Sequence, residues 1–201
     1  MKKLLALCSA LVLTFTAHAA QFEEGKHYKV LDVKKASKPV VTEFFSFYCP
    51  HCYKFESLIE RLKPALPKEA KFEKVHVGGF MGGDMAIPMA KSYATMVSLG
   101  VEDTMIPAMF AQIHQKRQAP KDEAELKQLF VDNGVEGKKF DAAYNSFAVN
   151  SMQKGFDKQF SASTLRGGVP GVVVNNKYIV LANEIRTYDE YNQLVNYLLT
   201  L

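Results

Sequence analysis

The sequence predicts an α/β protein in which a run of helices interrupts the part of the chain that forms β-strands. Segments rich in β-branched and aromatic residues lie only within residues 28–77 and 169–180, whereas residues 82–160 show only the helical spacing of apolar residues. Of the 201 residues, 48% are hydrophobic and 23% charged, which is typical of a globular protein and excludes disordered and collagen-like classes. A formal net charge of +4 does not indicate nucleic-acid binding.

The beginning of the chain has the pattern of a secretory signal peptide. Two lysines form the basic start, residues 4–16 are mostly apolar, and an Ala-His-Ala sequence matches the cleavage rule. A membrane anchor is the alternative, but this apolar stretch is shorter than the roughly 18 residues that spanning requires. We expect residues 1–19 to be removed, which takes away Cys8 and leaves Cys49 and Cys52. The mature protein is expected in the bacterial periplasm, where disulfides persist.

The first third predicts strand, strand, helix, strand. Residues 28–33 form a short strand-like run, and residues 40–47 are expected to be a buried central strand because they are rich in β-branched and aromatic residues. Pro50 suits the first position of a helix, and Pro64 and Pro67 end it. The apolar face of that helix consists of Phe55, Leu58, Ile59, Leu62 and Leu66. A further strand is expected at about residues 71–77.

The middle of the chain predicts helices only. Expected boundaries are Asp84 before the first helix, Gly100 at its end, Thr104 as the cap of the second and Gly134 after the third. Pro88 and Pro107 are expected only near first turns, because proline lacks the backbone N–H that a helix interior uses. One longer helix is expected to carry Phe140 to Met152 and to continue toward Phe160.

Four methionines lie in the first part of this helical region. A methionine stripe at helical spacing is usually core, and we expect this of Met89 and Met96. Flexible thioethers also suit a surface that accepts many different chains, and we expect Met81 and Met85 to contribute to such a groove.

The end of the chain predicts a hairpin and a helix. Residues 169–174 and 177–180 read as strands, and the two asparagines between them favour a tight turn, because Asn tolerates positive φ. Thr187 and Glu190 form a capping box at the start of the last helix. Its core positions are Tyr191, Leu194, Val195 and Leu198.

The candidate chemistry is concentrated at Cys49-Pro50-His51-Cys52. This Cys-x-x-Cys sequence lies between an apolar strand and an amphipathic helix, a context that favours a redox pair. With Pro50 at the first helical position, Cys49 lies at about the N-cap, facing unpaired N–H groups and the positive end of the helix dipole. A protonated His51 adds positive charge, so both features favour the thiolate of Cys49. Cys52 lies one turn inward and is expected to be shielded.

Three other interpretations of the cysteine pair compete with a redox role. A structural zinc site usually needs four ligands, and the mature chain has two cysteines and scattered histidines, so no metal is expected. A structural disulfide that closes so small a loop removes little entropy from the unfolded chain. An inert buried pair would need neither the helix terminus nor the Pro-His sequence.

The sequence is similar to the thioredoxin superfamily and, within it, to the DsbA family of periplasmic thiol:disulfide oxidoreductases. The similarity covers essentially the whole mature chain. It is carried by residues 43–52 (EFFSFYCPHC), His76-Val77, Phe80-Met81-Gly82-Gly83, Val101-Glu102-Asp103, residues 140–147 and Val169-Pro170. This resemblance implies a thioredoxin fold made of residues 20–82 and 161–201, interrupted by an all-helical insertion at residues 83–160.

The resemblance also implies a substrate-binding loop at Val169-Pro170. Most X-Pro bonds are trans, but the resemblance implies a cis bond here, beside the cysteines, with backbone groups offered to an extended substrate. Two departures from the family pattern affect this region: Gly167-Gly168 and Gly78-Gly79 stand where the family usually has one residue each.

Three charged residues lie in the predicted β and helix pattern near the cysteines. Glu43 interrupts an apolar strand, and Glu56 follows Cys52 by four residues on the same helix face. Either carboxylate could reach solvent at an edge, the usual fate of Glu. Lys74 on the following strand could pair with one of them. By resemblance, the set matches buried charges near the active site, where a carboxylate acts as a proton relay for the shielded cysteine.

We expect a thiol:disulfide oxidase that donates its Cys49–Cys52 disulfide to newly exported proteins through a mixed disulfide. A reductase or isomerase on the same fold, and a non-catalytic binder of unfolded periplasmic chains, are the alternatives. By resemblance, a DsbB-like quinone-linked membrane protein reoxidises the pair, and no dissociable cofactor is implied. We expect a monomer.

Overall fold

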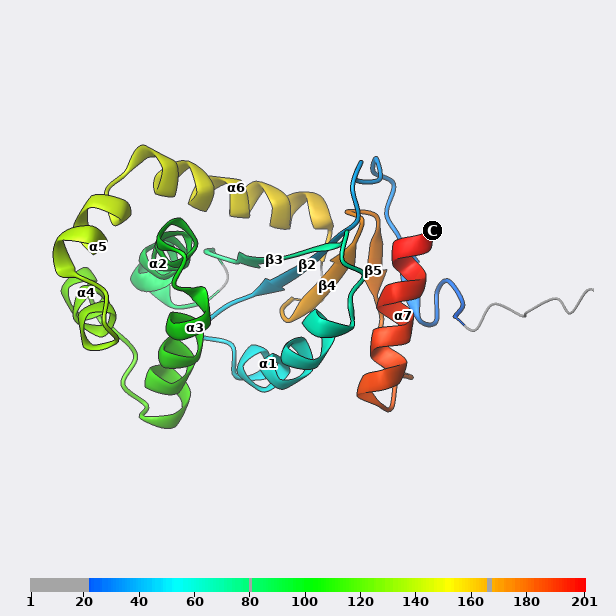
Figure 1. Cartoon of the computed structure of the whole chain (residues 1–201), viewed down its shortest axis with the longest axis horizontal. Helices are drawn as coiled ribbons and strands as arrows, with labels where there is room; N and C mark the ends of the chain where they lie inside the picture. The colour runs from blue at the N-terminus through cyan, green and yellow to red at the C-terminus, as the bar shows by residue number, and fades with distance from the viewer. Residues whose placement is uncertain (1–21, 80, 166–167) are drawn as a thin grey trace, which may run out of the picture.

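A computed structural model describes residues 22–79, 81–165 and 168–201 (Figure 1). The expected signal peptide, residues 1–19, lies outside the described residues. No helix in the described part of the chain is long and apolar enough to cross a membrane.

One five-stranded sheet forms the centre of the molecule. Its strands are β1 (Tyr28–Val30), β2 (Val40–Phe45), β3 (Lys71–His76), β4 (Gly171–Val174) and β5 (Tyr178–Val180). The order across the sheet is β1-β5-β4-β2-β3, with β2 parallel to β3 and all other neighbours antiparallel. As expected of a central strand, β2 is buried and has a neighbour on each side, although β4 and not β2 occupies the middle of the five strands. Because β2 has a hydrogen-bonded strand on each side and helices over both faces of the sheet, most of its side chains are buried, which explains its largely apolar sequence.

Helices cover both faces of this sheet. Figure 1 shows α1 (Pro50–Leu62) along one face and α6 (Phe147–Ser163) along the other. A short 3-10 turn, η1 (Lys63–Ala65), follows α1, and α7 (Tyr188–Thr200) packs on α1, β4 and β5. The apolar layer on this face includes Val41, Ile59, Leu62, Val172, Val174, Leu194, Val195 and Leu198. The predicted apolar faces of α1 and α7 are therefore the faces that are buried.

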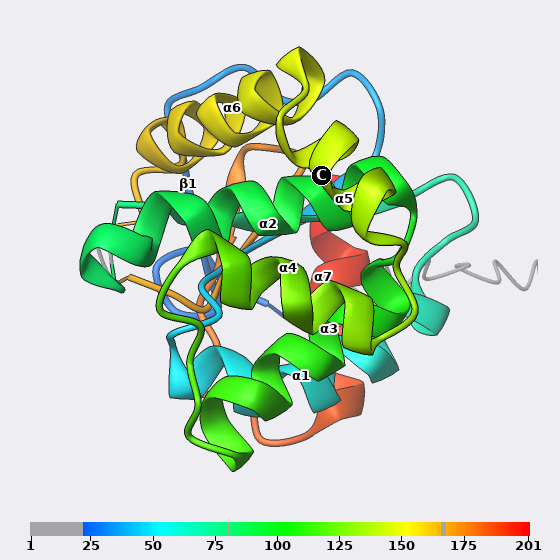
Figure 2. The same cartoon turned by 90° about the vertical axis from the view of Figure 1, so that its left-hand side faces the viewer.

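The helical region lies at the end of the sheet from which β2 leads into α1. It consists of η2 (Gly83–Met85), α2 (Ala86–Leu99), α3 (Glu102–Phe110), the π-helix η3 (Ala111–Gln115), α4 (Glu123–Asp132), α5 (Gly137–Tyr144) and α6. Figure 2 shows α2, α3, α4 and α5 grouped in front of the sheet. Met89 and Met96 are fully buried, as expected. Met81 and Met85 are partly buried and pack against the core.

Two helix boundaries and the position of one proline differ from the expected ones. Val101, not Thr104, is the N-cap of α3, because Thr104 N–H already donates to the Val101 carbonyl. Pro107 lies inside α3 and not in its first turn, and its ring replaces the N–H that would bond to the Asp103 carbonyl. The single long helix expected after Phe140 is divided into α5 and α6, because the Ser146 side chain caps α6 by accepting from Val149 N–H.

The C-terminal hairpin and helix form as predicted. Asn175 and Asn176 have φ values of 53° and 58°, and Lys177 N–H donates to the Val174 carbonyl to close the turn. Thr187 caps α7 by accepting from Glu190 N–H. The returning bond of the capping box is shifted by one residue, since Glu190 accepts from Arg186 N–H.

Candidate active site

Cys49 is the N-cap of α1, as the sequence predicted, and Pro50 is the first helical residue. The Cys52 N–H donates to Cys49 Sγ over 3.2 Å, so one of the orphan donors of the helix terminus points at this sulfur. The Cys49 thiol in turn donates to the Val169 carbonyl oxygen over 3.4 Å. Both cysteines are unpaired thiols in this structure. The Cys49 sulfur thus lies where helix N–H groups can stabilise negative charge.

Cys52 is shielded, as predicted. Its side chain has no exposed surface, whereas Cys49 retains 4%. Burial raises the pKa of the Cys52 thiol, and the hydrogen bond with Cys49 and the negative charge of Glu43 raise it further. Cys52 is therefore held as a thiol at neutral pH.

His51 is exposed and lies on the outer side of the helix terminus. It lines a groove of about 470 Å³ with Phe55, Leu58, Pro170 and Tyr188. No hydrogen bond or ion pair joins His51 to Cys49 among the described residues. His51 therefore lies two residues after Cys49 without a bond to it, and it borders the groove beside Pro170.

The Val169–Pro170 peptide bond is cis, as the resemblance implied. Pro170 contributes to the groove that contains His51, and Gly171 directly after it begins β4. Of the two expected departures from the family pattern, Gly167 lies outside the described residues. At the other, Gly78 is buried against Ile87 and Ala90, with its Cβ position 3.2 Å and 3.3 Å from their side chains.

The structure brings Glu43, Lys74 and Glu56 together. Lys74 Nζ lies 2.9 Å from Glu43 Oε2 and 2.5 Å from Glu56 Oε1. Glu43 and Lys74 face each other in the register of β2 and β3, and Glu56 reaches them from α1. Neither oxygen of Glu43 accepts a well-aligned hydrogen bond from a described residue. Of the three, Glu43 is fully buried, so the alternative that this carboxylate reaches solvent at an edge does not hold.

Burial determines the charge states of this cluster. Desolvation raises the pKa of Glu43 to about 7; the charge of Glu56 acts in the same direction and Lys74 opposes both. Burial also disfavours the charged form of Lys74, but the two carboxylates outweigh it and raise the pKa of Lys74. Glu43 is thus a carboxyl group that can gain or lose a proton near neutral pH, and its charge acts on Cys52.

Two histidines that the sequence did not single out hold the loop before Cys49. Phe47 N–H donates to His76 Nε2 over 3.1 Å, and the Phe47 carbonyl accepts from His114 Nε2 over 2.8 Å. Burial lowers the pKa of His76 to about 3, so His76 is neutral. His76 could have been suspected because it lies in the stretch that carries the resemblance. No local pattern marks His114, which comes from the helical region.

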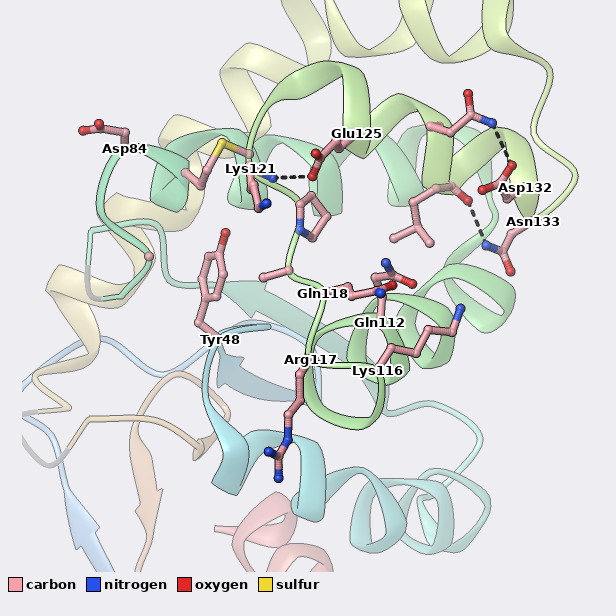
Figure 3. A pocket seen from close by; sticks show the side chains of 16 residues that line it. Tyr48, Asp84, Gln112, Lys116, Arg117, Gln118, Lys121, Glu125, Asp132 and Asn133 are labelled. Carbon is pink, nitrogen blue, oxygen red and sulfur yellow. Dashed lines mark hydrogen bonds between the residues drawn. The ribbon is translucent and has the colours of Figure 1, made fainter.

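A wide pocket opens on the other side of Tyr48, the residue before Cys49. It has a volume of about 1080 Å³ and extends between η2, η3 and α4. Figure 3 shows the Tyr48 ring pointing into it and Arg117 extending from η3 toward α1. Met85 lines this pocket, whereas Met81 is not among its lining residues. Tyr48, directly before Cys49, therefore lines this pocket, whereas His51, two residues after Cys49, lines the groove beside Pro170.

Within residues 22–79, 81–165 and 168–201, no three His, Cys, Asp or Glu side chains form a cluster that could hold a metal ion. The chemistry of the site is that of two thiols, a helix terminus and a buried carboxyl group.

Comparison with known proteins identifies the family. Residues 40–193 match the model of the DSBA-like thioredoxin domain. The thiol:disulfide interchange protein DsbA of Escherichia coli is 41% identical over 181 residues, covering 89% of this chain and 86% of that protein. DsbA of Dickeya dadantii is 40% identical over 200 residues, covering 98% and 95% of the two chains.

Solved structures agree. Proteus mirabilis DsbA in complex with a non-covalently bound peptide superposes with a TM-score of 0.84 at 32% identity, covering 90% of this chain and all of that one. Pseudomonas aeruginosa DsbA gives a TM-score of 0.76 at 30% identity, covering 90% of this chain and 95% of that one. The chain therefore belongs to the DsbA family of thiol:disulfide oxidoreductases with the thioredoxin fold.

Proposed function

We propose that Cys49 and Cys52 are the redox pair of this oxidoreductase and that they donate their disulfide to newly exported proteins. The observation that carries this proposal is the position of the Cys49 sulfur at the N-terminus of α1, where it accepts the Cys52 N–H and touches the Val169 carbonyl. A sulfur in that position is stabilised as a thiolate. A stabilised thiolate favours the reduced form of the pair, which makes the disulfide an oxidant.

The transfer takes place in two exchange steps. A client thiolate attacks Cys49 Sγ, the Cys49–Cys52 bond breaks, and Cys52 leaves with the electron pair. A second client thiolate then attacks the client sulfur of the mixed disulfide, and Cys49 leaves as a thiolate. The client loses two electrons and gains a disulfide, and the cysteine pair gains those two electrons.

Glu43 is proposed to supply the proton that Cys52 takes up in the first step. Burial holds Cys52 as a thiol, so its departing sulfur requires a proton. The pKa of about 7 for Glu43 allows this carboxyl group to carry one at neutral pH. Glu56, only partly buried, and Lys74 complete a path of ionisable groups from Glu43 toward solvent.

Val169, Pro170 and His51 are proposed to bind the client. The Val169 carbonyl lies against Cys49 Sγ, so an extended peptide that donates an N–H to this oxygen brings its cysteine to the reactive sulfur. The apolar groove beside Pro170 can take the neighbouring side chain. Pro50 fixes the start of α1 and thereby the N-cap position of Cys49.

The remaining expectations concern the cellular setting. Residues 1–19 are proposed to be removed on export to the periplasm, and a DsbB-like membrane protein is proposed to reoxidise the pair through another mixed disulfide. No dissociable cofactor takes part in the proposed exchange. Residues 20–82 and 161–201 are proposed as the thioredoxin-like domain and residues 83–160 as the insertion, which is consistent with the five strands lying outside the insertion.

The reduction potential of the pair tests the oxidase proposal. The purified mature protein would be equilibrated in glutathione buffers and its free thiols quantified. We expect a potential well above the roughly −270 mV of thioredoxin. A potential near that of thioredoxin would support the reductase alternative, and a protein that does not exchange with glutathione would support a non-catalytic binder.

A further inference from the structure

His114 contacts the active-site loop from the helical region. Its Nε2 lies 2.8 Å from the carbonyl oxygen of Phe47, which is two residues before Cys49. A carbonyl oxygen only accepts hydrogen bonds, so His114 must carry a hydrogen on Nε2. The same residue is also held through its N–H group, because Phe47 N–H donates to His76 Nε2. The Nε2 atom of His76 therefore carries no hydrogen, whereas the Nε2 atom of His114 carries one.

The Phe47 carbonyl belongs to the turn that places Cys49. Cys49 N–H donates to the Ser46 carbonyl over 3.1 Å, and Tyr48 N–H donates to Ser46 Oγ over 3.3 Å. Phe47 is thus the second residue of a four-residue turn whose last residue carries the reactive sulfur. Rotation of the Phe47 peptide would change the direction from which the chain enters the N-cap position.

The His114 ring is itself held against α1. It stacks on the Tyr53 ring at a centroid distance of 5.2 Å and an angle of 6°, and it packs on Phe110 at 5.9 Å. Gln115 Nε2 donates to the Tyr53 hydroxyl, and Tyr53 N–H donates to the Cys49 carbonyl. The segment η3 therefore contacts both the turn before the cysteine pair and the first turn of α1 after it.

The backbone of η3, which carries His114, has an unusual conformation. Ala111–Gln115 is a π-helix, in which Lys116 N–H reaches back five residues to the Ala111 carbonyl, and Arg117 ends it with a φ of 58°. Wide turns of this kind are often found at functional sites. Both views of the molecule show α3 running beside α1 (Figures 1 and 2), so the widened turn at the end of α3 lies next to the cysteine pair.

We infer that His114 is a positioning residue, which fixes the Ser46–Cys49 turn so that the Cys49 sulfur stays at the N-cap when the pair is reduced. In the oxidised protein, the Cys49–Cys52 bond holds Cys49 by itself. In the reduced protein, that covalent restraint is absent and the hydrogen bond from His114 replaces part of it. Loss of the His114 donor therefore destabilises the reduced form more than the oxidised form.

This inference rests on the proposed redox function, and the experiment separates the two. His114→Phe keeps a ring to stack on Tyr53 but removes the donor, whereas His114→Gln restores an N–H donor. We expect His114→Phe to lower the equilibrium constant with glutathione between about twofold and tenfold in the direction of a weaker oxidant, the effect of one hydrogen bond. We expect His114→Gln to recover most of that loss.

A matched control is His27→Leu. His27 is buried and, like the half-buried His114, makes one bond to the backbone, with Nδ1 accepting from Glu23 N–H. Substitution of a purely structural histidine lowers the stability of both redox forms equally, so it leaves the equilibrium constant with glutathione unchanged. We expect this result for His27→Leu. An unchanged constant in His114→Phe, or an equal loss in His114→Phe and His114→Gln, would overturn the positioning role. Failure of the unsubstituted protein to exchange with glutathione would instead overturn the proposed function.

A second measurement needs no variant. Nitrogen-detected NMR of the reduced protein reports which ring nitrogen carries hydrogen in each neutral histidine. We expect His114 to be protonated at Nε2 and His76 at Nδ1. A bare Nε2 on His114 would show that the bond to Phe47 does not form.

Discussion

Cys49 Sγ lies 3.4 Å from the carbonyl oxygen of Val169, although 120 positions separate the two residues in the sequence. Neither residue could bind a client in this way alone. Val169 presents a backbone acceptor that an extended peptide can use, and Cys49 presents the sulfur that the peptide must reach. In the proposed exchange, the contact between them brings client binding and disulfide transfer to the same place.

Substitution of either cysteine is expected to abolish client oxidation, because neither variant can form the Cys49–Cys52 disulfide. Cys49→Ser also leaves no sulfur at the helix N-terminus. In Cys52→Ser, the Cys49 thiolate should be trapped in a mixed disulfide when it attacks the disulfide of an oxidised client, because no Cys52 thiol remains to displace the client sulfur. Free-thiol assay of a reduced client measures the loss of oxidation, and non-reducing electrophoresis after incubation with an oxidised client detects the trapped species. Unchanged client oxidation by Cys49→Ser would leave the protein as a non-catalytic binder.

The reduced protein is expected to be more stable than the oxidised protein. In the reduced form, Cys52 N–H and the helix dipole stabilise charge on the Cys49 sulfur, and the disulfide closes too small a loop to compensate in the unfolded chain. Each tenfold preference for the reduced form corresponds to about 1.4 kcal/mol, and we expect at least that difference. Urea unfolding at neutral pH, with and without a reductant, measures it. Equal midpoints would contradict a stabilised thiolate.

Local signals account for what the sequence predicted. Pro50 determined where α1 begins, and this alone placed Cys49 at the N-cap and Cys52 one turn inside. Asn175 and Asn176 likewise determined the hairpin through their tolerance of positive φ. Such features depend on a few neighbouring residues, which a sequence displays directly. The proximity of Glu43 and Lys74 could not be read from neighbouring residues, because it depends on the pairing of β2 with β3.

The features that escaped prediction depend on tertiary contacts. The Phe47–His114 bond joins residues 67 positions apart, and no periodicity marks a histidine that reaches across to another element. Pro107 is tolerated inside α3 because its position is exposed and the helix soon widens into η3. The break between α5 and α6 depends on one serine that bonds to a backbone N–H instead of continuing the helix.

Glu43 is expected to make the protein less stable as the pH rises toward neutrality. Its pKa is about 7 in the folded protein and near 4.5 in the unfolded chain, so the folded state binds more protons between those values. The contribution of Glu43 to the free energy of unfolding is therefore largest below about pH 4.5. It is lost as the pH rises from about 4.5 through 7. The full shift corresponds to about 3 kcal/mol of folding free energy. Urea unfolding between pH 4.5 and 8 measures this slope.

Glu43→Gln should flatten that dependence, because the variant has no ionisable group at this position. The matched control is Glu73→Gln on the neighbouring strand, where Glu73 pairs with Lys71 and retains 30% of its side-chain surface exposed. The control should leave the slope between pH 4.5 and 8 close to that of the unsubstituted protein. A slope that Glu43→Gln leaves unchanged would mean that another group controls the pH dependence.

Cys52 is expected to resist alkylation in the folded, reduced protein. Its side chain is fully buried, and burial raises the pKa of its thiol, whereas the thiolate is the form that reacts. Iodoacetamide at pH 8 should therefore modify Cys49 first, with Cys52 reacting only after urea is added. Mass spectrometry of the peptides that contain each cysteine measures both rates. Equal rates without urea would contradict the shielding of Cys52.

Gly82 is expected to be required for the position of the Tyr48 ring. Gly82 has a φ of 104°, and a Cβ built on it would overlap ring atoms of Tyr48, the residue before Cys49. Gly82→Ala should therefore cost about 1–3 kcal/mol of stability through backbone strain and overpacking. It should also slow exchange with glutathione, because the Tyr48 ring is displaced beside the reactive sulfur.

Gly79→Ala is the matched control, since Gly79 has open space at its Cβ position. This substitution is expected to change stability by less than about 0.5 kcal/mol. Equal effects of the two substitutions on exchange would show that the contact between Gly82 and Tyr48 does not control access to Cys49.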